Sequence, residues 1–238
     1  MKTADMPYAV DGRTYTGYLA LPDGTTGKRP GILVCHQGNG LGEHAKERAR
    51  MLASEGYVAF ALDMYGAVAK NMQEAMAWIQ ALVGNPAELR KRAAAGLDVL
   101  KSEPAVDTNR LAAIGYCFGG GVVLEMARAM AGLSCVCAFH PGLTGQPESD
   151  ERKVLCKVMV CAGVDDPLIP PEARERFISL MKAAGADWQL ITYGGAGHSF
   201  TDRSVDDLKM AGFAYNALAD KRSWVHMRAL FDESLGAP

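Results

Sequence analysis

The eleven residues 111–121, LAAIGYCFGGG, constrain the fold of this chain more than any other stretch. A short apolar strand leads directly into Cys117, which has glycines two residues before it and two residues after it, and then into a helical pattern over residues 122–130. Gly115 and Gly119 allow the strand and the helix to approach closely around a sharp turn, which projects the residue at its apex out of the sheet. At a helix N-terminus, Cys117 is placed where a thiolate or an oxyanion is stabilised. The alternative is a buried structural cysteine beside a glycine-rich turn.

The composition is that of an ordinary globular chain. With 238 residues, 49% hydrophobic and 22% charged, it can bury a large core, and we expect one domain over residues 1–238. A net charge of −2 without a basic stripe disfavours nucleic acid and favours a small-molecule partner. The first ten residues show no signal-peptide pattern and we expect no membrane contact, so we expect a cytoplasmic protein, either a monomer or a small homo-oligomer.

The six cysteines do not form a disulfide pattern, because the chain is long and shows no secretory signal. Apart from Cys117, they lie in or beside apolar, β-rich runs, where small buried thiols pack. These five are Cys35, Cys135, Cys137, Cys156 and Cys161. Cys135 and Cys137 lack the C-x-x-C spacing of redox proteins, so redox chemistry is a weaker alternative.

Apolar strand patterns alternate with helical patterns along most of the chain, which predicts a mostly parallel sheet flanked by helices, an α/β fold. Expected strands cover 15–21, 31–35, 57–62, a stretch from 111, 134–139, 157–162 and 188–193. Expected helices cover 43–55, 71–83, 86–101, 122–130 and 171–184. The tail over 205–235 is expected to be mostly helical, with an apolar face formed by Leu208, Phe213, Leu218, Val225 and Leu230.

Three chemically active side chains follow three of the later strands, at the sheet edge where α/β proteins place their functional residues. Cys117, Asp166 and His198 occur in the order nucleophile, acid, histidine, which is the order of an α/β-hydrolase triad. We favour Asp166 over the adjacent Asp165, which we expect to be exposed. Glycines around His198 allow its loop to fold back toward Cys117.

An oxyanion hole is expected from two backbone N–H groups. One belongs to Phe118, directly after the nucleophile, and the other to Gly38, in the loop after residues 31–35. That loop also imitates a dinucleotide-binding motif, but Glu43 stands where the third glycine belongs. His36 and His44 lack metal-ligand spacing, so we expect no metal and no cofactor.

Four segments together resemble the dienelactone hydrolase family of α/β-hydrolases: residues 34–66, GYCFGGG, AGVDDPLIPP and YGGAGHSF. The resemblance implies a compact α/β-hydrolase fold without a large cap. It also implies a Cys117–His198–Asp166 triad that hydrolyses carboxylic ester or lactone bonds through a thioester. The family enzyme has a glutamate where Gln37 stands, and it binds its substrate carboxylate with arginines, of which Arg203 could supply one. We expect Gln37, Tyr65 and Arg203 to contact the substrate.

Two hypotheses remain open at this point. A fold does not fix a function, so a non-catalytic small-molecule binding protein or a thiol-based sensor is the alternative to a hydrolase. With a neutral amide at Gln37, we expect Cys117 to rest as a thiolate beside protonated His198, and Gln37→Glu to raise the pKa of the thiol. The simpler possibility is that Gln37 only hydrogen-bonds its loop.

Overall fold

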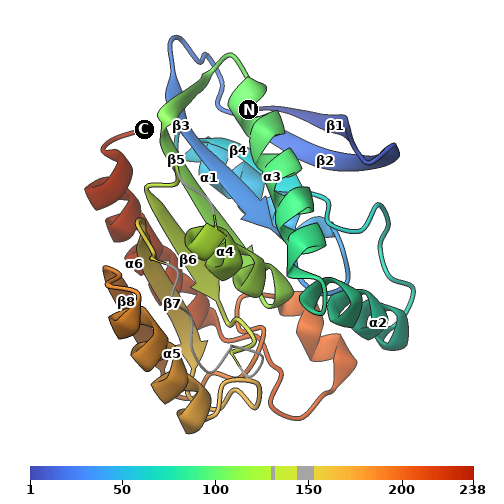
Figure 1. The fold of residues 1–238 in the computed structure, drawn as a ribbon, viewed down its shortest axis with the longest axis vertical. Coiled ribbons are helices and arrows are strands. Elements are labelled where there is room, and N and C mark those ends of the chain that lie inside the picture. The colour runs from blue at the N-terminus through green and yellow to red at the C-terminus, as the bar shows by residue number, and fades with distance from the viewer. Residues whose placement is uncertain (130–131, 144–152) are drawn as a thin grey trace.

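The computed structural model describes residues 1–129, 132–143 and 153–238, and an eight-stranded sheet runs through them in the order β1-β2-β4-β3-β5-β6-β7-β8 (Figure 1). The pairings from β4 to β8 are parallel, whereas β1 pairs antiparallel with β2 and β2 antiparallel with β4. The strands are β1 Lys2–Val10, β2 Arg13–Leu21, β3 Arg29–Cys35, β4 Val58–Leu62, β5 Val106–Tyr116, β6 Cys135–Phe139, β7 Lys157–Gly163 and β8 Trp188–Tyr193.

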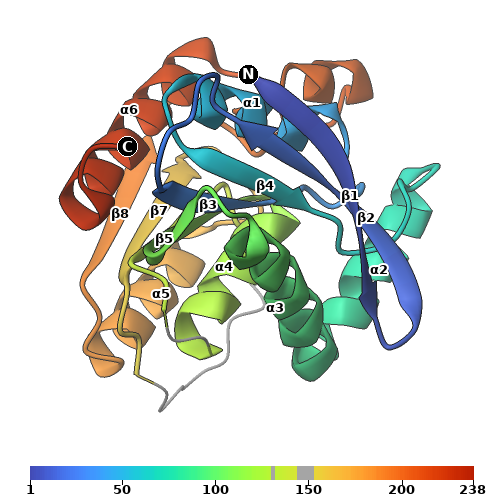
Figure 2. The ribbon, with the colours of Figure 1, turned by 90° about the horizontal axis from the view of Figure 1, so that it is seen from above.

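Helices cover both faces of the sheet (Figure 2). Their bounds are α1 Glu43–Ser54, α2 Met72–Val83, α3 Pro86–Ser102, α4 Phe118–Ala129, α5 Pro171–Ala183, the 3₁₀ helix η1 Arg203–Leu208, and α6 Ala217–Leu235. One core cluster packs α3, α4 and α5 against one face of the sheet, and a second packs α1 and α6 against the opposite face. The expected mostly parallel sheet between two helical layers is therefore confirmed. The expected end of α4 at Met130 lies outside the described residues.

The parallel strands are buried on both faces, which explains their unbroken apolar sequences. Every residue of β4 and β6 is buried, as is every residue of β3 after Arg29. Parallel strands point their carboxyl ends to one edge, so the loops after β3, β5, β7 and β8 meet there. All six cysteines are free, and the five outside the turn at Cys117 are buried, as expected.

The chain begins with a β-hairpin that the sequence analysis did not predict. Strand β1 pairs with β2 over its whole length, and the turn between them is made by Asp11 at φ 50° and Gly12 at φ 77°. Two consecutive positive φ values define the type I′ turn that matches the twist of paired strands. The hairpin extends the sheet at the edge beyond β4.

The expectation for the C-terminal tail is partly wrong. Residues 209–216 connect η1 to α6 without helix. Leu208, Leu218 and Val225 are 53%, 62% and 57% exposed, so they do not form the buried face. The face that packs on the sheet consists instead of Ala219, Ser223, Met227, Leu230, Phe231 and Leu235. Their spacing of three or four residues keeps them on one side of the helix, and the small Ala219 and Ser223 were not recognised as part of that stripe.

Within the described residues, no helix combines the length and apolar character needed to cross a membrane.

Candidate active site

Cys117 is the single residue between β5 and α4, and its backbone adopts φ 52°. This left-handed conformation is strained for a residue with a side chain, and such strain often accompanies function. The flanking glycines are sterically required. A Cβ on Gly115 would collide with the carbonyl oxygen of Gly119, and a Cβ on Gly119 would collide with that of Cys35. The turn leaves the thiol half-buried at the carboxyl edge of the sheet.

His198 and Asp166 form a buried pair beside this turn. Nδ1 of His198 lies 2.8 Å from Oδ2 of Asp166, and both side chains are fully buried. The other carboxylate oxygen, Oδ1, accepts a hydrogen bond from the backbone N–H of Leu168 at 2.8 Å. The neighbouring Asp165 is exposed. The structure therefore brings Asp166, and not Asp165, to the imidazole.

The second ring nitrogen of His198 is left for Cys117. Nε2 is buried and has no regular hydrogen-bond partner among the described residues, but the imidazole interacts with the Cys117 sulfur. Catalytic hydrogen bonds are often loose without substrate. Burial alone lowers the pKa of His198, but the Cys117 thiolate and the hydrogen bond with Asp166 outweigh burial and raise it to about 10. Burial alone raises the pKa of Cys117, but His198 and nearby N–H donors outweigh burial and lower it. Each group therefore stabilises the charged form of the other.

Two backbone amides lie near the same sulfur. The N–H groups of Phe118 and Gly38 lower the pKa of the Cys117 thiol, because they stabilise its thiolate. Phe118 is the first residue of α4, and Gly38 lies in the loop after β3. The position of Gly38 is restricted by α2, because a Cβ there would lie 2.6 Å from Cδ1 of Ile79. The structure therefore brings together Cys117, His198, Asp166 and the two amides named from the sequence.

The side chain of Gln37 is occupied by the loop after β8. Its Nε2 donates to Oδ2 of Asp202 at 2.6 Å, and its Oε1 accepts from the Ser199 hydroxyl at 3.5 Å. Burial raises the pKa of Asp202, but His44 and the Gln37 amide outweigh burial and lower it, which stabilises the ionised carboxylate. The amide thus makes the loop contacts of the simpler hypothesis, and its effect on the thiol stays a prediction.

Tyr65 and Arg203 lie on different sides of the site. Tyr65 is 3% exposed, stacks on Phe118 at 5.4 Å between ring centroids and contacts Trp78 of α2. Its hydroxyl is buried without a hydrogen-bond partner among the described residues, and burial together with the Cys117 thiolate raises the pKa of this phenol. Arg203 is exposed, and its guanidinium lies 4.5 Å from the ring centre of Tyr215. Tyr65 is therefore within electrostatic reach of the sulfur, whereas Arg203 lies at the surface.

A sequence profile of the dienelactone hydrolase family matches residues 15–235. The chain belongs to the dienelactone hydrolase family. The resemblance read from the four segments is confirmed, and with it the assignment of the chain to the hydrolases. Among curated proteins, the chain is 26% identical over 227 residues to a probable 2-oxo-3-(5-oxofuran-2-ylidene)propanoate lactonase of Bradyrhizobium sp.. That match covers 90% of this chain and 87% of the relative.

Solved structures of the family superimpose closely on the chain. The structure named m3DLH is 41% identical with a TM-score of 0.94, covering 98% of both chains. A dienelactone hydrolase-like promiscuous phosphotriesterase from metagenomic libraries is 38% identical with a TM-score of 0.93, covering 99% of both chains. The expected α/β-hydrolase fold is confirmed by these similarities.

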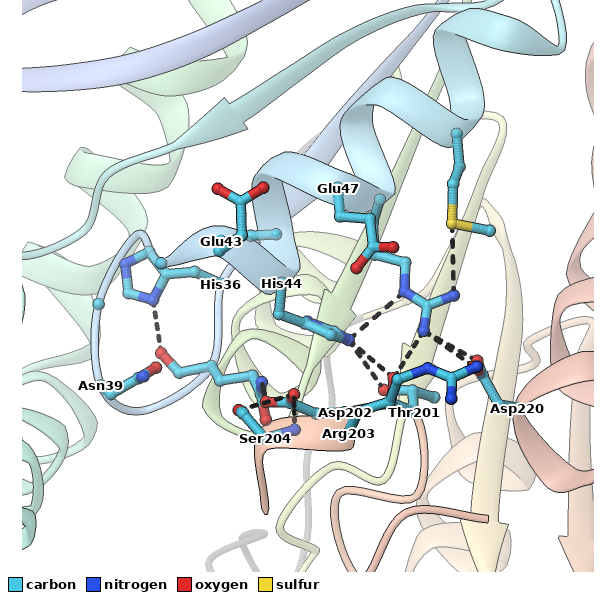
Figure 3. A pocket seen from close by; sticks show the side chains of 16 residues that line it. His36, Asn39, Glu43, His44, Glu47, Thr201, Asp202, Arg203, Ser204 and Asp220 are labelled. Atoms are coloured by element: carbon cyan, nitrogen blue, oxygen red, sulfur yellow. Dashed lines mark hydrogen bonds and ion pairs between the residues drawn. The ribbon is translucent and has the colours of Figure 1, made fainter. Parts of the chain in front are cut away.

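A buried polar network that the sequence analysis did not predict binds the loop that carries His198. Nε2 of His140 lies 2.8 Å from Oγ1 of Thr201, and Arg48 donates to the Thr201 carbonyl at 2.6 Å. Arg48 also forms an ion pair with Asp220 of α6 at 2.9 Å (Figure 3). These residues come from α1, α6 and the loop after β6, so no local sequence pattern connects them. They anchor Thr201, three residues after His198, directly to α1 and to the loop after β6, and through Arg48 to α6.

Arg48, Thr201 and Asp220 also line a cavity of about 410 Å³ on the α1 side of the site (Figure 3). Gln37, Asp202 and Arg203 line the same cavity. The Gln37–Asp202 hydrogen bond therefore forms part of the boundary of this polar cavity.

Proposed function

We propose that this chain hydrolyses carboxylic ester or lactone bonds, with Cys117 as nucleophile, His198 as acid and base, and Asp166 as the residue that orients the imidazole. The observation that carries the proposal is the convergence on one sulfur of a buried Asp166–His198 pair and two backbone N–H donors. A nucleophile, an oriented base and an oxyanion site are the groups that acyl transfer needs. The family membership and the lactonase named among the relatives support the same bond class.

The proposed acylation begins with Cys117 as a thiolate and His198 as an imidazolium. The Cys117 thiolate attacks the carbonyl carbon, and the electron pair of the C=O bond moves onto the oxygen. The N–H groups of Phe118 and Gly38 donate to this oxyanion. When the tetrahedral intermediate collapses, the C–O bond to the alcohol breaks, and the His198 imidazolium gives its proton to the departing oxygen. A thioester on Cys117 and a neutral His198 remain.

Deacylation reverses these roles. Neutral His198 accepts a proton from water as the hydroxyl oxygen attacks the thioester carbonyl, and the same two amides hold the second oxyanion. The C–S bond then breaks, which releases the carboxylic acid and restores the thiolate beside protonated His198. Asp166 stabilises the imidazolium and fixes its tautomer throughout.

Three further residues are proposed to contact the substrate. Tyr65 offers a buried hydroxyl within reach of the charge on Cys117. Gln37 and Arg203 line the polar cavity beside the site. The family enzyme binds the carboxylate of its substrate with arginines, but here helix α2 contains no arginine and Arg203 is exposed. We therefore propose that the substrate is an ester or lactone that has no carboxylate group to be buried in the site.

The decisive experiment is turnover of p-nitrophenyl acetate combined with mass spectrometry of the quenched enzyme. We expect a mass increase equal to one acetyl group, located on the peptide that contains Cys117. Cys117→Ala should abolish both turnover and the adduct, whereas Cys156→Ala, which removes a buried thiol elsewhere, should retain both. Turnover by folded Cys117→Ala enzyme above a few per cent would contradict the proposal.

Turnover of a panel of esters and lactones tests the alternative functions. A binding protein or thiol sensor would show no catalytic turnover, although Cys117 would still react with alkylating agents or oxidants. Because a 38% identical structure is described as a promiscuous phosphotriesterase, the panel includes a phosphotriester. Ester and lactone turnover higher than phosphotriester turnover would assign carbonyl chemistry as the main activity.

The remaining proposals concern the whole chain. We propose a single domain acting as a monomer or small homo-oligomer. Six free cysteines fit a reducing compartment, which supports a cytoplasmic location.

A further inference from the structure

The three consecutive glycines after the nucleophile do not serve one purpose. A Cβ on Gly119 would collide with the backbone of Cys35, and a Cβ on Gly120 would lie 2.8 Å from Cβ of Pro141. A Cβ on Gly121 would meet no atom of the described residues within 4 Å. Packing therefore requires the first two glycines but not the third, although glycine weakens a helix relative to alanine. What Gly121 leaves open is a cavity.

This cavity has a volume of about 640 Å³, within the usual range for small-molecule sites. It lies between the α2–α3 junction and α4, two elements that are close together in Figure 1. Its α4 wall consists of Phe118, Gly121, Val122, Glu125 and Arg128. Gly121 follows Cys117 by four residues, about 6 Å along a helix axis. The first residues of the α4 wall, Phe118 and Gly121, therefore lie within about one helical turn of the proposed nucleophile.

Along α4, the wall changes from apolar to charged with sequence distance from Cys117. Phe118 and Val122 come first and are buried. Glu125 follows and forms an ion pair with Arg90 at 2.7 Å. An apolar group entering beside Cys117 would gain burial over the first part and reach paired charges in the second. The cavity thus suits an apolar group of limited length.

The position of His198 indicates which half of an ester this group belongs to. The leaving alcohol must lie next to His198, because the imidazolium protonates its oxygen. The described cavity lining includes neither His198 nor any residue of the loop that carries it. The acyl group is attached to the sulfur through its carbonyl carbon. It is therefore the half of the ester that can extend along α4.

We propose that the cavity between the α2–α3 junction and α4 binds the acyl chain of a substrate with an apolar acyl group of moderate length, and that Gly121 keeps this subsite open. The inference rests on the proposed function, since it places the acyl carbon on Cys117. It makes Gly121 a specificity-determining position.

The test compares kcat/KM for p-nitrophenyl acetate, butyrate and hexanoate, which share a leaving group. Each buried methylene is worth about fourfold. We expect the wild-type hexanoate-to-acetate ratio to exceed about ten, and Gly121→Leu to lower that ratio at least about tenfold by filling the cavity. Gly121→Ala should lower it much less. Ala129→Leu adds the same side chain at the exposed end of α4 and should leave the ratio unchanged.

A wild-type preference for acetate would overturn the inference. So would an unchanged ratio in Gly121→Leu enzyme whose circular dichroism and thermal melt match those of the wild type. If the wild type turns over no ester, the proposed function fails instead, and calorimetric binding of hexanoate decides the subsite. Binding that is at least tenfold weaker in Gly121→Leu supports the subsite, whereas equal binding or none in the wild type overturns it.

Discussion

The side-chain amide of Gln37 donates to the carboxylate of Asp202 across 2.6 Å and so joins the loop after β3 to the loop after β8. One loop carries Gly38 and the other continues from His198, so this hydrogen bond connects the proposed oxyanion site to the proposed base. Gln37→Glu would place two carboxylates at this distance. We expect a loss of about 1–3 kcal/mol in the free energy of unfolding at pH 7, measured by urea titration.

The double variant Gln37→Glu/Asp202→Asn exchanges the amide and the carboxylate and provides the matched control. It should recover most of the lost stability. If the double variant is as unstable as Gln37→Glu, the two side chains are not coupled in the way the structure shows.

The triad acid can be tested against its own neighbour. Asp166→Asn should lower kcat by about 10⁴-fold, because an amide leaves the imidazole in the wrong tautomer. Asp165→Asn is a matched control, since Asp165 is exposed and adjacent. It should change kcat less than about threefold in the same ester assay. Comparable losses in both variants would remove Asp166 from the proposed role.

The charge state of Cys117 predicts its reactivity. His198 and the two amides lower the pKa of the thiol, so iodoacetamide labelling should persist below pH 8.5, about where free thiols lose their proton. Replacing His198 by Ala removes the cation and raises that pKa. Labelling at pH 7 should then slow more than about tenfold, because each unit of pKa lowers the thiolate fraction tenfold.

Labelling rate against pH, with Cys117→Ala used to subtract the five buried thiols, measures this effect. The same profile tests Gln37→Glu, which the sequence argument expects to label more slowly at pH 7. Coincident wild-type and His198→Ala profiles would show that the imidazole does not control the charge of the thiol. Coincident wild-type and Gln37→Glu profiles would show that residue 37 does not control the charge of the thiol.

The turn at the nucleophile should be intolerant of a single added carbon. In Gly115→Ala the new Cβ would overlap the backbone of Gly119, so we expect a loss of about 3 kcal/mol or failure to fold. Gly194→Ala is the control, because a Cβ there meets nothing within 4 Å in the part of the chain that the structure describes. It should change stability by less than about 0.5 kcal/mol in the same denaturation assay. Equal stability of the two variants would contradict the steric account of the turn.

The parallel part of the fold could be predicted because each buried strand and each covering helix has a local pattern. The hairpin was missed although Asp11-Gly12 is a strong type I′ signal, because the preceding residues 2–6 are mostly exposed and show no apolar alternation. Leu230 was placed correctly on the buried face of α6, but Leu218 and Val225 were placed there wrongly. The small Ala219 and Ser223, whose size lets the helix approach the sheet, belong to that face instead.

Within the site, the residues of the turn at Cys117 could be predicted from the sequence, because the backbone of that turn fixes their positions. Cys117, Phe118 and Gly115 belong to a single motif with its own steric rules. The partners of Gln37 and the anchoring of Thr201 were not accessible, because they join residues 61 to 165 positions apart. Such contacts depend on side-chain directions that spacing along the chain does not determine.

The open position at Gly121 also affects how this protein could be altered by selection. A Cβ there meets no described atom within 4 Å, whereas a Cβ on Gly119 or Gly120 would collide with a neighbour. A library randomised at this single codon would therefore yield mostly folded variants that differ in the depth of one cavity. Descendants with different substrate ranges could arise by single-step changes here without first acquiring stabilising mutations elsewhere.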